Sequence, residues 1–449
     1  MSATAPVSAA TSPLVSPWQA PWYATPAHAT PQHAMVLGAG IAGAAVAFSL
    51  ARRGIRVTVF ERGATVAGGA SGNAQGVLHT KLSPHATPLT QLLVQGYAYS
   101  RALLPQTLGA PGQDWDDCGI LQLSVDAEEA RRHAGLAACD WTAGWLRSVS
   151  AAEGSALSGI PQVHAGLWFE GGGWVHPPAW VRALLAHPLI TVCCEAEAVS
   201  LTHLAAGDWQ LTFADGRHAT APVVVVATAH EAAHLPVLAH LPLSGIRGQT
   251  AVVAATAGSR ALKSVVCGGS YVSPARQDGS HCFGATFRFQ QTTCTVTDEE
   301  HEENLAKLAV LAPPLYQALG GAALRPAQLL GRSAFRATTP DYLPLVGGVA
   351  EAALFAPTYP APEQVERQQL TTPAPWLSGL YVSLGHGSRG LVTAPLAGEA
   401  LGAAIAGEPS PLSAALLAAV HPNRFLLRAQ KRRHAPAKGA VGGAHSGKP

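Results

Sequence analysis

Charged side chains are scarce in this chain. Asp, Glu, Lys and Arg make up 12% of its 449 residues, against 48% hydrophobic residues. This composition excludes a charge-rich disordered protein and a coiled coil. Long hydrophobic runs are also lacking, because residues 222–243, the most apolar stretch, contain Glu231, several His and three Pro, so we predict no membrane helix.

Motifs for several kinds of chemistry are missing as well. The seven cysteines form no Cys-x-x-Cys pair, so we expect reduced thiols in a cytoplasmic protein rather than disulfides or a zinc site. Neither the spacing of the histidines nor a cluster of acids leads us to predict a metal site. It also lacks the Gly-x-Ser-x-Gly elbow of serine hydrolases.

The two ends of the chain differ in charge from the rest. Residues 1–33 contain no charged side chain and are rich in Ala and Pro, which predicts a disordered arm or linker, and residues 434–449 predict a disordered tail. Seven basic residues and no acid follow His421, although the formal net charge of the whole chain is only +2. This segment is either a contact for a polyanion or a solvated basic tail.

A glycine-rich turn between two strands predicts a dinucleotide site. A strand over 34–37 leads into Gly38, Gly40 and Gly43 of GAGIAG, then into a helix, a second strand over 56–60 and Glu61. In such a unit the glycines let the backbone approach a pyrophosphate at the helix N-terminus, and the acid accepts hydrogen bonds from ribose hydroxyls. An acid at this position favours NAD or FAD over NADP.

The segment after the second strand bears on which dinucleotide is bound. It is the loop VAGGASGNAQG (66–76), whereas an NAD enzyme would continue with regular strand–helix units. The loop suits contact with a large flat ring, or it is a flexible surface loop. Beyond it, short strands and helices alternate, so we expect a nucleotide-binding domain interrupted twice by antiparallel insertions.

Several segments together resemble one family. GASGNAQG, GGGWVHPPAW, SGIRGQTA, GRSAFRATTPDYLPLVGG, GLYVSLGHGSRG and HPNRFLLRAQKR occur in the same order in the FAD-dependent oxidoreductase domain of the bifunctional MnmC tRNA-modification enzymes. That domain belongs to the D-amino-acid-oxidase and glycine-oxidase group. The resemblance implies an α/β fold with a Rossmann-like FAD-binding domain (34–115, 165–245 and 330–433) and an inserted, mainly antiparallel β substrate domain (116–164 and 246–329).

The resemblance also implies the residues of the site. The expected FAD contacts lie in the glycine turn, at the end of the second strand, in the following loop and in GHGSRG, and they are Gly38, Gly40, Ile41, Ala42, Gly43, Glu61, Arg62, Gly69, Ala70, Ser71, Gly72, Asn73, Gln75, Gly76, Gly387, Ser388, Arg389 and Gly390. His386 departs from the family, which more often has a small or apolar residue there.

Arginine is the natural ligand for a substrate carboxylate, since its planar fork binds both oxygens. Arg336 matches the carboxylate-binding position of the glycine-oxidase group, and Arg332 and Arg247 are further candidates. An ion pair of Arg336 with Asp341 or another acid is the structural alternative. Tyr271 resembles a substrate-domain position that faces the flavin, although packing within a sheet is the more common role of such an aromatic.

The implied reaction is oxidation of the carboxymethylaminomethyl group on the wobble uridine of tRNA to an aminomethyl group, with release of glyoxylate. The anticodon loop of tRNA would be the partner, and Arg424–Arg433 would contact its phosphates or pack at the domain edge. Only about 20 residues precede PWYATP, so we expect no methyltransferase domain here and methylation by a separate enzyme. Oxidation of free glycine, sarcosine or D-amino acids, and a non-catalytic flavin-containing tRNA-binding protein, remain alternatives.

Overall fold

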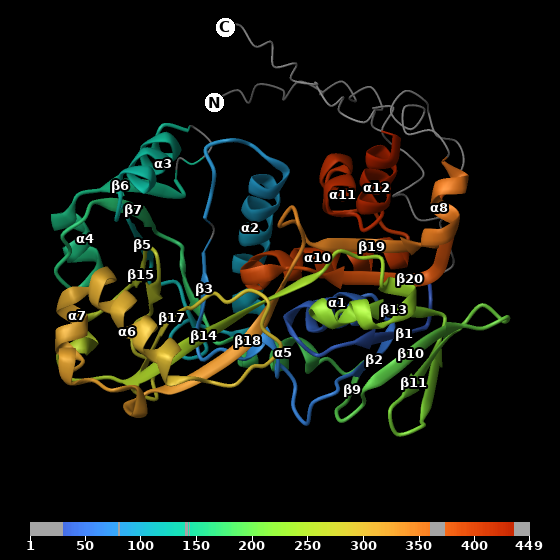
Figure 1. The fold of residues 1–449 in the computed structure, drawn as a ribbon, viewed down its shortest axis with the longest axis horizontal. Coiled ribbons are helices and arrows are strands. Elements are labelled where there is room, and N and C mark those ends of the chain that lie inside the picture. Colours follow the sequence, from blue (N-terminus) through green and yellow to red (C-terminus); the bar gives the residue numbers. More distant parts are fainter. Residues whose placement is uncertain (1–29, 80, 140–141, 143, 360–372, 435–449) are drawn as a thin grey trace, which may run out of the picture.

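The structure, a computed structural model, describes residues 30–79, 81–139, 142, 144–359 and 373–434. Two large sheets lie side by side (Figure 1). One is mostly parallel and the other mostly antiparallel, which confirms the predicted α/β class with an antiparallel β insertion. Residues 435–449 of the predicted tail and residues 1–29 of the predicted arm lie outside the described residues, whereas His434 ends helix α12 (Arg424–His434).

The parallel sheet carries the predicted dinucleotide unit. Five parallel strands and one antiparallel edge strand run in the order β19 (Leu345–Ala350), β20 (Trp376–Leu384), β13 (Val223–Val226), β1 (His33–Leu37), β2 (Arg56–Phe60) and β9 (Ile190–Cys193). The central strands β1 and β13 are almost wholly buried, as expected for a sheet that is covered on both faces.

Four helices pack around one face of this sheet, and they are α1 (Ile41–Ala51), α2 (Pro88–Leu108), α5 (Pro177–Leu185) and α10 (Gly390–Ala406). Helices α1 and α10 approach closely because their contact is built from small residues. A Cβ atom on Gly398 would lie 2.6 Å from the carbonyl carbon of Ala45. This packing brings the N-termini of two helices that are about 350 residues apart to the same edge of the sheet.

The second sheet has eight strands. Their order is β18 (Leu330–Thr338), β14 (Ser244–Ala254), β17 (Ser280–Gly284), β16 (Tyr271–Val272), β15 (Val265–Cys267), β5 (Ile120–Leu123), β7 (Gly166–Phe169) and β6 (Leu146–Val149). This order differs from the predicted boundaries at 165 and 330, because β7 and β18 pair with strands of the insertion. The β18 strand also contacts the nucleotide-binding half, so it joins the two parts of the molecule.

The remaining elements complete the two halves. Smaller sheets are formed by β3 (Gly76–Leu78), β8 (Gly173–Val175) and β4 (Trp115–Asp116), and by β10 (Ala198–His203), β11 (Trp209–Phe213) and β12 (His218–Ala221). The other helices are α3 (Ala127–Ala137), α4 (Ala151–Ser158), α6 (Asp298–Leu311), α7 (Pro313–Ala318), α8 (Ala352–Thr358), α11 (Ala414–Val420) and α12 (Arg424–His434). Within the described ranges, no helix is both long and apolar enough to span a bilayer.

An ion-pair cluster anchors the C-terminal helix α12. Arg424 is 4% exposed and donates two hydrogen bonds to the Asp341 carboxylate (3.0 and 2.9 Å), and Arg428 contacts the same carboxylate at 2.5 Å. Burial alone would raise the pKa of Asp341. The hydrogen bonds and charges of Arg424 and Arg428 outweigh it and lower this pKa to about 2.

We therefore expect Asp341→Asn to lower the free energy of unfolding by about 2 kcal/mol at pH 7, because charged hydrogen bonds are lost. The pKa of Asp341 is lower in the folded protein than the ordinary value of about 3.9. The stabilisation is therefore complete above about pH 4 and is lost as the pH falls towards 2. Urea unfolding at pH 7, 4 and 3 measures this, and an equally steep loss in the variant between pH 4 and 3 would contradict it.

Candidate dinucleotide and substrate site

The glycine turn between β1 and α1 is shaped by close backbone contacts. Gly38 has φ +95°, and a Cβ atom there would lie 2.7 Å from the Ala227 carbonyl oxygen at the end of β13. A Cβ on Gly43 would collide with the Gly38 carbonyl. The turn therefore requires glycine at both positions, and it leaves the N-terminus of α1, with Ile41 and Ala42, open towards an anion.

Glu61 is held in place directly after β2. Its carboxylate accepts hydrogen bonds from the backbone N–H groups of Ala39 (2.8 Å) and Gly63 (3.0 Å). This fixes the acid at the carboxyl end of the parallel strands, which is where dinucleotides bind in such sheets. Arg62 lies on the rim instead, with its side chain 59% exposed and paired with Glu231 at 2.8 Å.

We expect Gly38→Ala to weaken FAD binding at least about tenfold, because the methyl group would push the β13 end away and strain the turn. Gly54→Ala is the matched control, since Gly54 also has a positive φ (+79°) but has open space around its Cα. The flavin-to-protein ratio after dialysis, read from visible absorbance, measures the effect. If both variants lost flavin equally, backbone strain alone would explain the loss, and the contact of the added methyl group with β13 would not contribute.

The loop after β2 contacts both halves of the molecule. Ser71 Oγ accepts a hydrogen bond from the Ile41 N–H at 2.9 Å, so the loop lies against the glycine turn. The Arg332 guanidinium donates to the Gly68 carbonyl, and a Cβ on Gly72 would collide with that guanidinium. Gln75 is fully buried, and its amide bonds Pro274 O and Cys282 N. Its side chain therefore ties the loop to the second sheet, and a cofactor contact of Gln75 stays a prediction.

The predicted GHGSRG segment reaches the same place. Gly387–Arg389 forms one short 3₁₀ turn, Gly390 opens α10, and a Cβ on Gly390 would lie 3.2 Å from Ile41 Cγ2. His386 is half-buried, with its ring nitrogens bonded to the hydroxyls of Ser383 (3.1 Å) and Thr393 (2.9 Å), and desolvation of the ring lowers its pKa to about 4. It is therefore a neutral structural residue at pH 7.

Two buried polar atoms without a partner fit a bound dinucleotide. Thr228 Oγ1 has no hydrogen bond within the described protein, and it follows β13 beside Gly38. Arg332 Nη1 likewise has none, although Nη2 of the same guanidinium donates to the Gly68 carbonyl. Buried polar groups are normally satisfied, so both are available to a ligand with phosphate, hydroxyl or carbonyl groups. Thr228 was not identified from the sequence as a site residue. The signal that could have indicated it is its position just after the buried run of valines in β13.

Arg336 lies on the face of the second sheet that also carries Arg332. In the β14–β18 pair, Arg336 is opposite Ile246 and Arg332 is opposite Thr250. The guanidinium of Arg336 donates to the Thr286 carbonyl at 3.2 Å and covers the Phe287 ring at 4.4 Å. Within the described residues no carboxylate lies within 4 Å of Arg336, because Asp341 pairs with Arg424 and Arg428 instead. The alternative of an Arg336–Asp341 pair is therefore wrong.

Tyr271 belongs to the same face, since it is in register with Gly284 of β17. Its hydroxyl lies 3.7 Å from Cys282 Sγ, and burial, followed by the influence of Cys282, raises the pKa of Tyr271 well above its usual value. The phenol therefore stays protonated and can donate a hydrogen bond but cannot serve as a base near pH 7.

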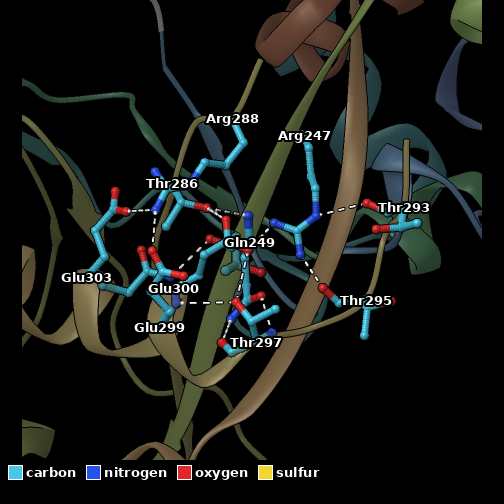
Figure 2. A network of polar contacts seen from close by, with 12 residues as sticks. Arg247, Gln249, Thr286, Arg288, Thr293, Thr295, Thr297, Glu299, Glu300 and Glu303 are labelled. Atoms are coloured by element: carbon cyan, nitrogen blue, oxygen red, sulfur yellow. Dashed lines mark hydrogen bonds and ion pairs between the residues drawn. The ribbon is translucent and has the colours of Figure 1, made fainter. Parts of the chain in front are cut away.

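Arg247 faces the opposite side of the sheet, which corrects its prediction as a carboxylate ligand. It is 4% exposed, pairs with the equally buried Glu300 of α6, and donates to the carbonyls of Thr293 and Thr295 (Figure 2). Glu300 also accepts a hydrogen bond from the Thr286 hydroxyl at 2.5 Å. The carbonyl of Thr286 in turn holds Arg336, so the Arg247–Glu300 pair positions the arginine on the other face.

Of the two alternatives for Arg424, the structure has packing at the domain edge and not a phosphate contact. That side chain is buried and bonded to Asp341 and to the Pro344 carbonyl. The side chains of Leu426 and Leu427 on the same helix pack against a buried cluster around Phe355. Of the basic residues that follow, Lys431 and Arg432 are exposed. The described part of the chain contains no group of three or more His, Cys, Asp or Glu side chains arranged to hold a metal ion.

The parallel sheet, the glycine turn with Glu61 and the adjoining arginine-bearing face define a dinucleotide-dependent oxidoreductase. Residues 33–404 match the family model described as FAD dependent oxidoreductase (DAO). The chain belongs to this family, and FAD is its cofactor.

Curated relatives are similar over most of the chain. The tRNA 5-methylaminomethyl-2-thiouridine biosynthesis bifunctional protein MnmC of Pseudomonas putida (strain W619) is 48% identical over 419 residues, and that of Chromobacterium violaceum is 48% identical over 418 residues. Each alignment covers 93% of this chain but 63% of the relative. The chain thus spans less than two thirds of the length of these relatives.

Solved structures share the fold. Glycine oxidase from Geobacillus kaustophilus superimposes with a TM-score of 0.70 at 23% identity, covering 88% of this chain and 99% of that protein. Iminodiacetate oxidase from Chelativorans sp. BNC1 gives a TM-score of 0.66 at 22% identity, covering 85% and 97%.

Proposed function

We propose that this protein oxidises the carboxymethylaminomethyl group on the wobble uridine, or 2-thiouridine, of tRNA. A hydride leaves the methylene carbon between nitrogen and carboxylate, and the nitrogen loses its proton, so that a carbon–nitrogen double bond forms. Water adds to this bond, which then breaks to give the aminomethyl group and glyoxylate. FAD, when bound, supplies the hydride acceptor.

The observation that carries the proposal is the placement of Arg336. Among the described residues, its guanidinium has a single hydrogen-bond partner and no carboxylate partner. It lies on the same face of the second sheet as Arg332, which contacts the loop over 66–76. An arginine has five N–H donors, so most of its fork remains for the two oxygens of a substrate carboxylate. Burial lowers the pKa of Arg336, and an added carboxylate would relieve the cost of the unpaired charge.

The remaining polar groups position the substrate rather than move protons. Tyr271 stays neutral and can donate a hydrogen bond beside Arg336. His386, with its pKa lowered to about 4 and both ring nitrogens in hydrogen bonds, is not available as a base. The amine therefore reacts in its neutral form, and the protein contributes mainly orientation of the methylene group.

The identity to the MnmC proteins supports tRNA as the carrier of the substrate group, since their name refers to biosynthesis of 5-methylaminomethyl-2-thiouridine in tRNA. Three points stay predictions. They are a separate aminomethyluridine methyltransferase as partner, the cytoplasmic localisation, and the domain boundaries that the sheets leave open.

An anaerobic titration of the flavin-loaded protein tests the proposed function. The additions are tRNA that carries carboxymethylaminomethyluridine, the same tRNA without the modification, and free glycine or sarcosine. We expect the modified tRNA alone to bleach the visible flavin band, with one glyoxylate released per flavin. Bleaching by the free amino acids would overturn the proposal in favour of an amino-acid oxidase, and a flavin that nothing bleaches would favour a non-catalytic role.

A further inference from the structure

Three aromatic side chains are largely exposed on the described surface. They are Phe287 (49% exposed), Phe289 (67%) and Tyr342 (56%). Phe287 stacks against Arg336 at 4.4 Å, and Phe289 is two residues further along the same segment. Exposed Phe side chains cost hydration free energy, so their concentration at one site indicates a binding surface.

Strand register places Phe287 and Phe289 on the same side of the sheet as Arg336. The segment after β17 continues to pair with β14, with Arg288 opposite Arg247. Side chains alternate along a strand, so Arg288 and Arg247 point to one face and both phenylalanines to the other. Arg336, which is in register with Ile246, belongs to the face of the phenylalanines.

Charge divides between the two faces in the same way. Arg288 reaches across to Glu303 of α6 at 2.6 Å, and Arg247 pairs with Glu300 of that helix (Figure 2). The first turn of α6 is acidic and covers the face away from the phenylalanines. On the phenylalanine face, Arg332 and Arg336 have no carboxylate within 4 Å among the described residues. That face is therefore aromatic and cationic, which suits an anionic ligand with flat rings.

Unpaired nucleotides have this chemistry. Proteins bind single-stranded RNA by stacking its splayed bases on aromatic side chains while arginines contact its phosphates. We propose that Phe287 and Phe289, here called the aromatic platform, stack on the bases that flank the substrate nucleotide of an RNA loop at the entrance to the Arg336 site. This inference rests on the proposed function, and it adds the residues that select RNA over a free amine.

Phe289→Ala is the sharpest test, because Phe287 packs directly against Arg336, whereas Phe289 lies two residues further along the segment. The substrates are an anticodon stem-loop that carries carboxymethylaminomethyluridine and the same modified nucleoside alone. We expect the stem-loop to have at least about a tenfold higher kcat/KM than the nucleoside, and Phe289→Ala to lower the stem-loop value by about tenfold. The nucleoside value should change less than about twofold. Phe289→Trp should retain stem-loop activity, and Leu354→Ala, at an exposed residue of α8, is the control.

A stem-loop with an abasic site next to the modified uridine completes the test. If a base stacks on Phe289, the unsubstituted protein should have a lower kcat/KM for the abasic stem-loop than for the intact one. Phe289→Ala should have nearly the same kcat/KM for both stem-loops, because the stacking contact is already lost. Fluorescence anisotropy of an unmodified stem-loop gives a readout apart from turnover, and its affinity should fall in parallel. Equal affinity for both proteins, or equal kcat/KM for nucleoside and stem-loop, would overturn the inference. Failure of the unsubstituted protein to oxidise either substrate would instead overturn the proposed function.

Discussion

Arg336→Ala is expected to lower kcat/KM for the carboxylate-bearing substrate by roughly a thousandfold, because two charged hydrogen bonds to the carboxylate are lost. The bound flavin should be retained, since the contacts of Arg336 are with Thr286 and Phe287 of the second sheet and not with the glycine turn. Stopped-flow measurement of flavin bleaching, together with the flavin-to-protein ratio, separates the two effects.

Arg332→Ala provides the contrast on the same face of β18. Arg332 contacts the Gly68 carbonyl and lies against Gly72, so this variant should lose flavin more readily than Arg336→Ala. Arg336→Lys keeps the charge but not the fork and should recover only part of the activity. Turnover of Arg336→Ala at the rate of the unsubstituted protein would remove Arg336 as the carboxylate ligand.

Glu300→Ala is expected to destabilise the protein by about 3–5 kcal/mol, because it leaves the Arg247 guanidinium buried without a counter-charge. It also removes the acceptor of the Thr286 hydroxyl, whose backbone carbonyl holds Arg336. Where the variant folds, KM should therefore rise as well. Urea unfolding of the flavin-loaded protein gives the stability, and steady-state kinetics give KM.

The neighbouring residue supplies the control for Glu300. Glu299 is in the same helical turn but its side chain is 85% exposed, so Glu299→Ala should change stability by less than about 0.5 kcal/mol. Replacing both buried charges, as in Arg247→Met with Glu300→Leu, should cost less than Glu300→Ala alone, since no unpaired charge remains. A double variant that is less stable than Glu300→Ala would show that the pair contributes through its own attraction.

Local sequence patterns predicted the nucleotide-binding unit well. The strand, glycine turn, helix and terminal acid over 34–61 form one continuous motif, and the structure has β1, α1, β2 and the Glu61 contacts there. The edges of the insertions were predicted less well. β7 and β18 are short apolar or mixed strands whose sheet membership depends on partners far away in the sequence, and pairing over such distances leaves no local signal.

The orientation of side chains on β14 was beyond the sequence too. Arg247 and Arg336 both stand in motifs of the resemblance, but the register of β14 with β18 puts them on opposite faces of the sheet. A shift of β14 by one residue would turn Arg247 to the face that carries Arg336. Likewise, the sequence left Arg424 as either a phosphate contact or a packed residue, because nothing local indicated that Asp341 would lie beside it.

The position of Arg332 and Arg336 on one strand limits how substrate preference can change. Four residues of β-strand span about 13 Å, so the distance between the arginine at the Gly68–Gly72 loop and the arginine at the carboxylate site is set by the backbone. A substitution of either side chain alters reach only by the length of that side chain. A shift to amines with a longer acid arm would therefore require an insertion or a register change in β18, and such changes are rare because they disturb every pair with β14 at once.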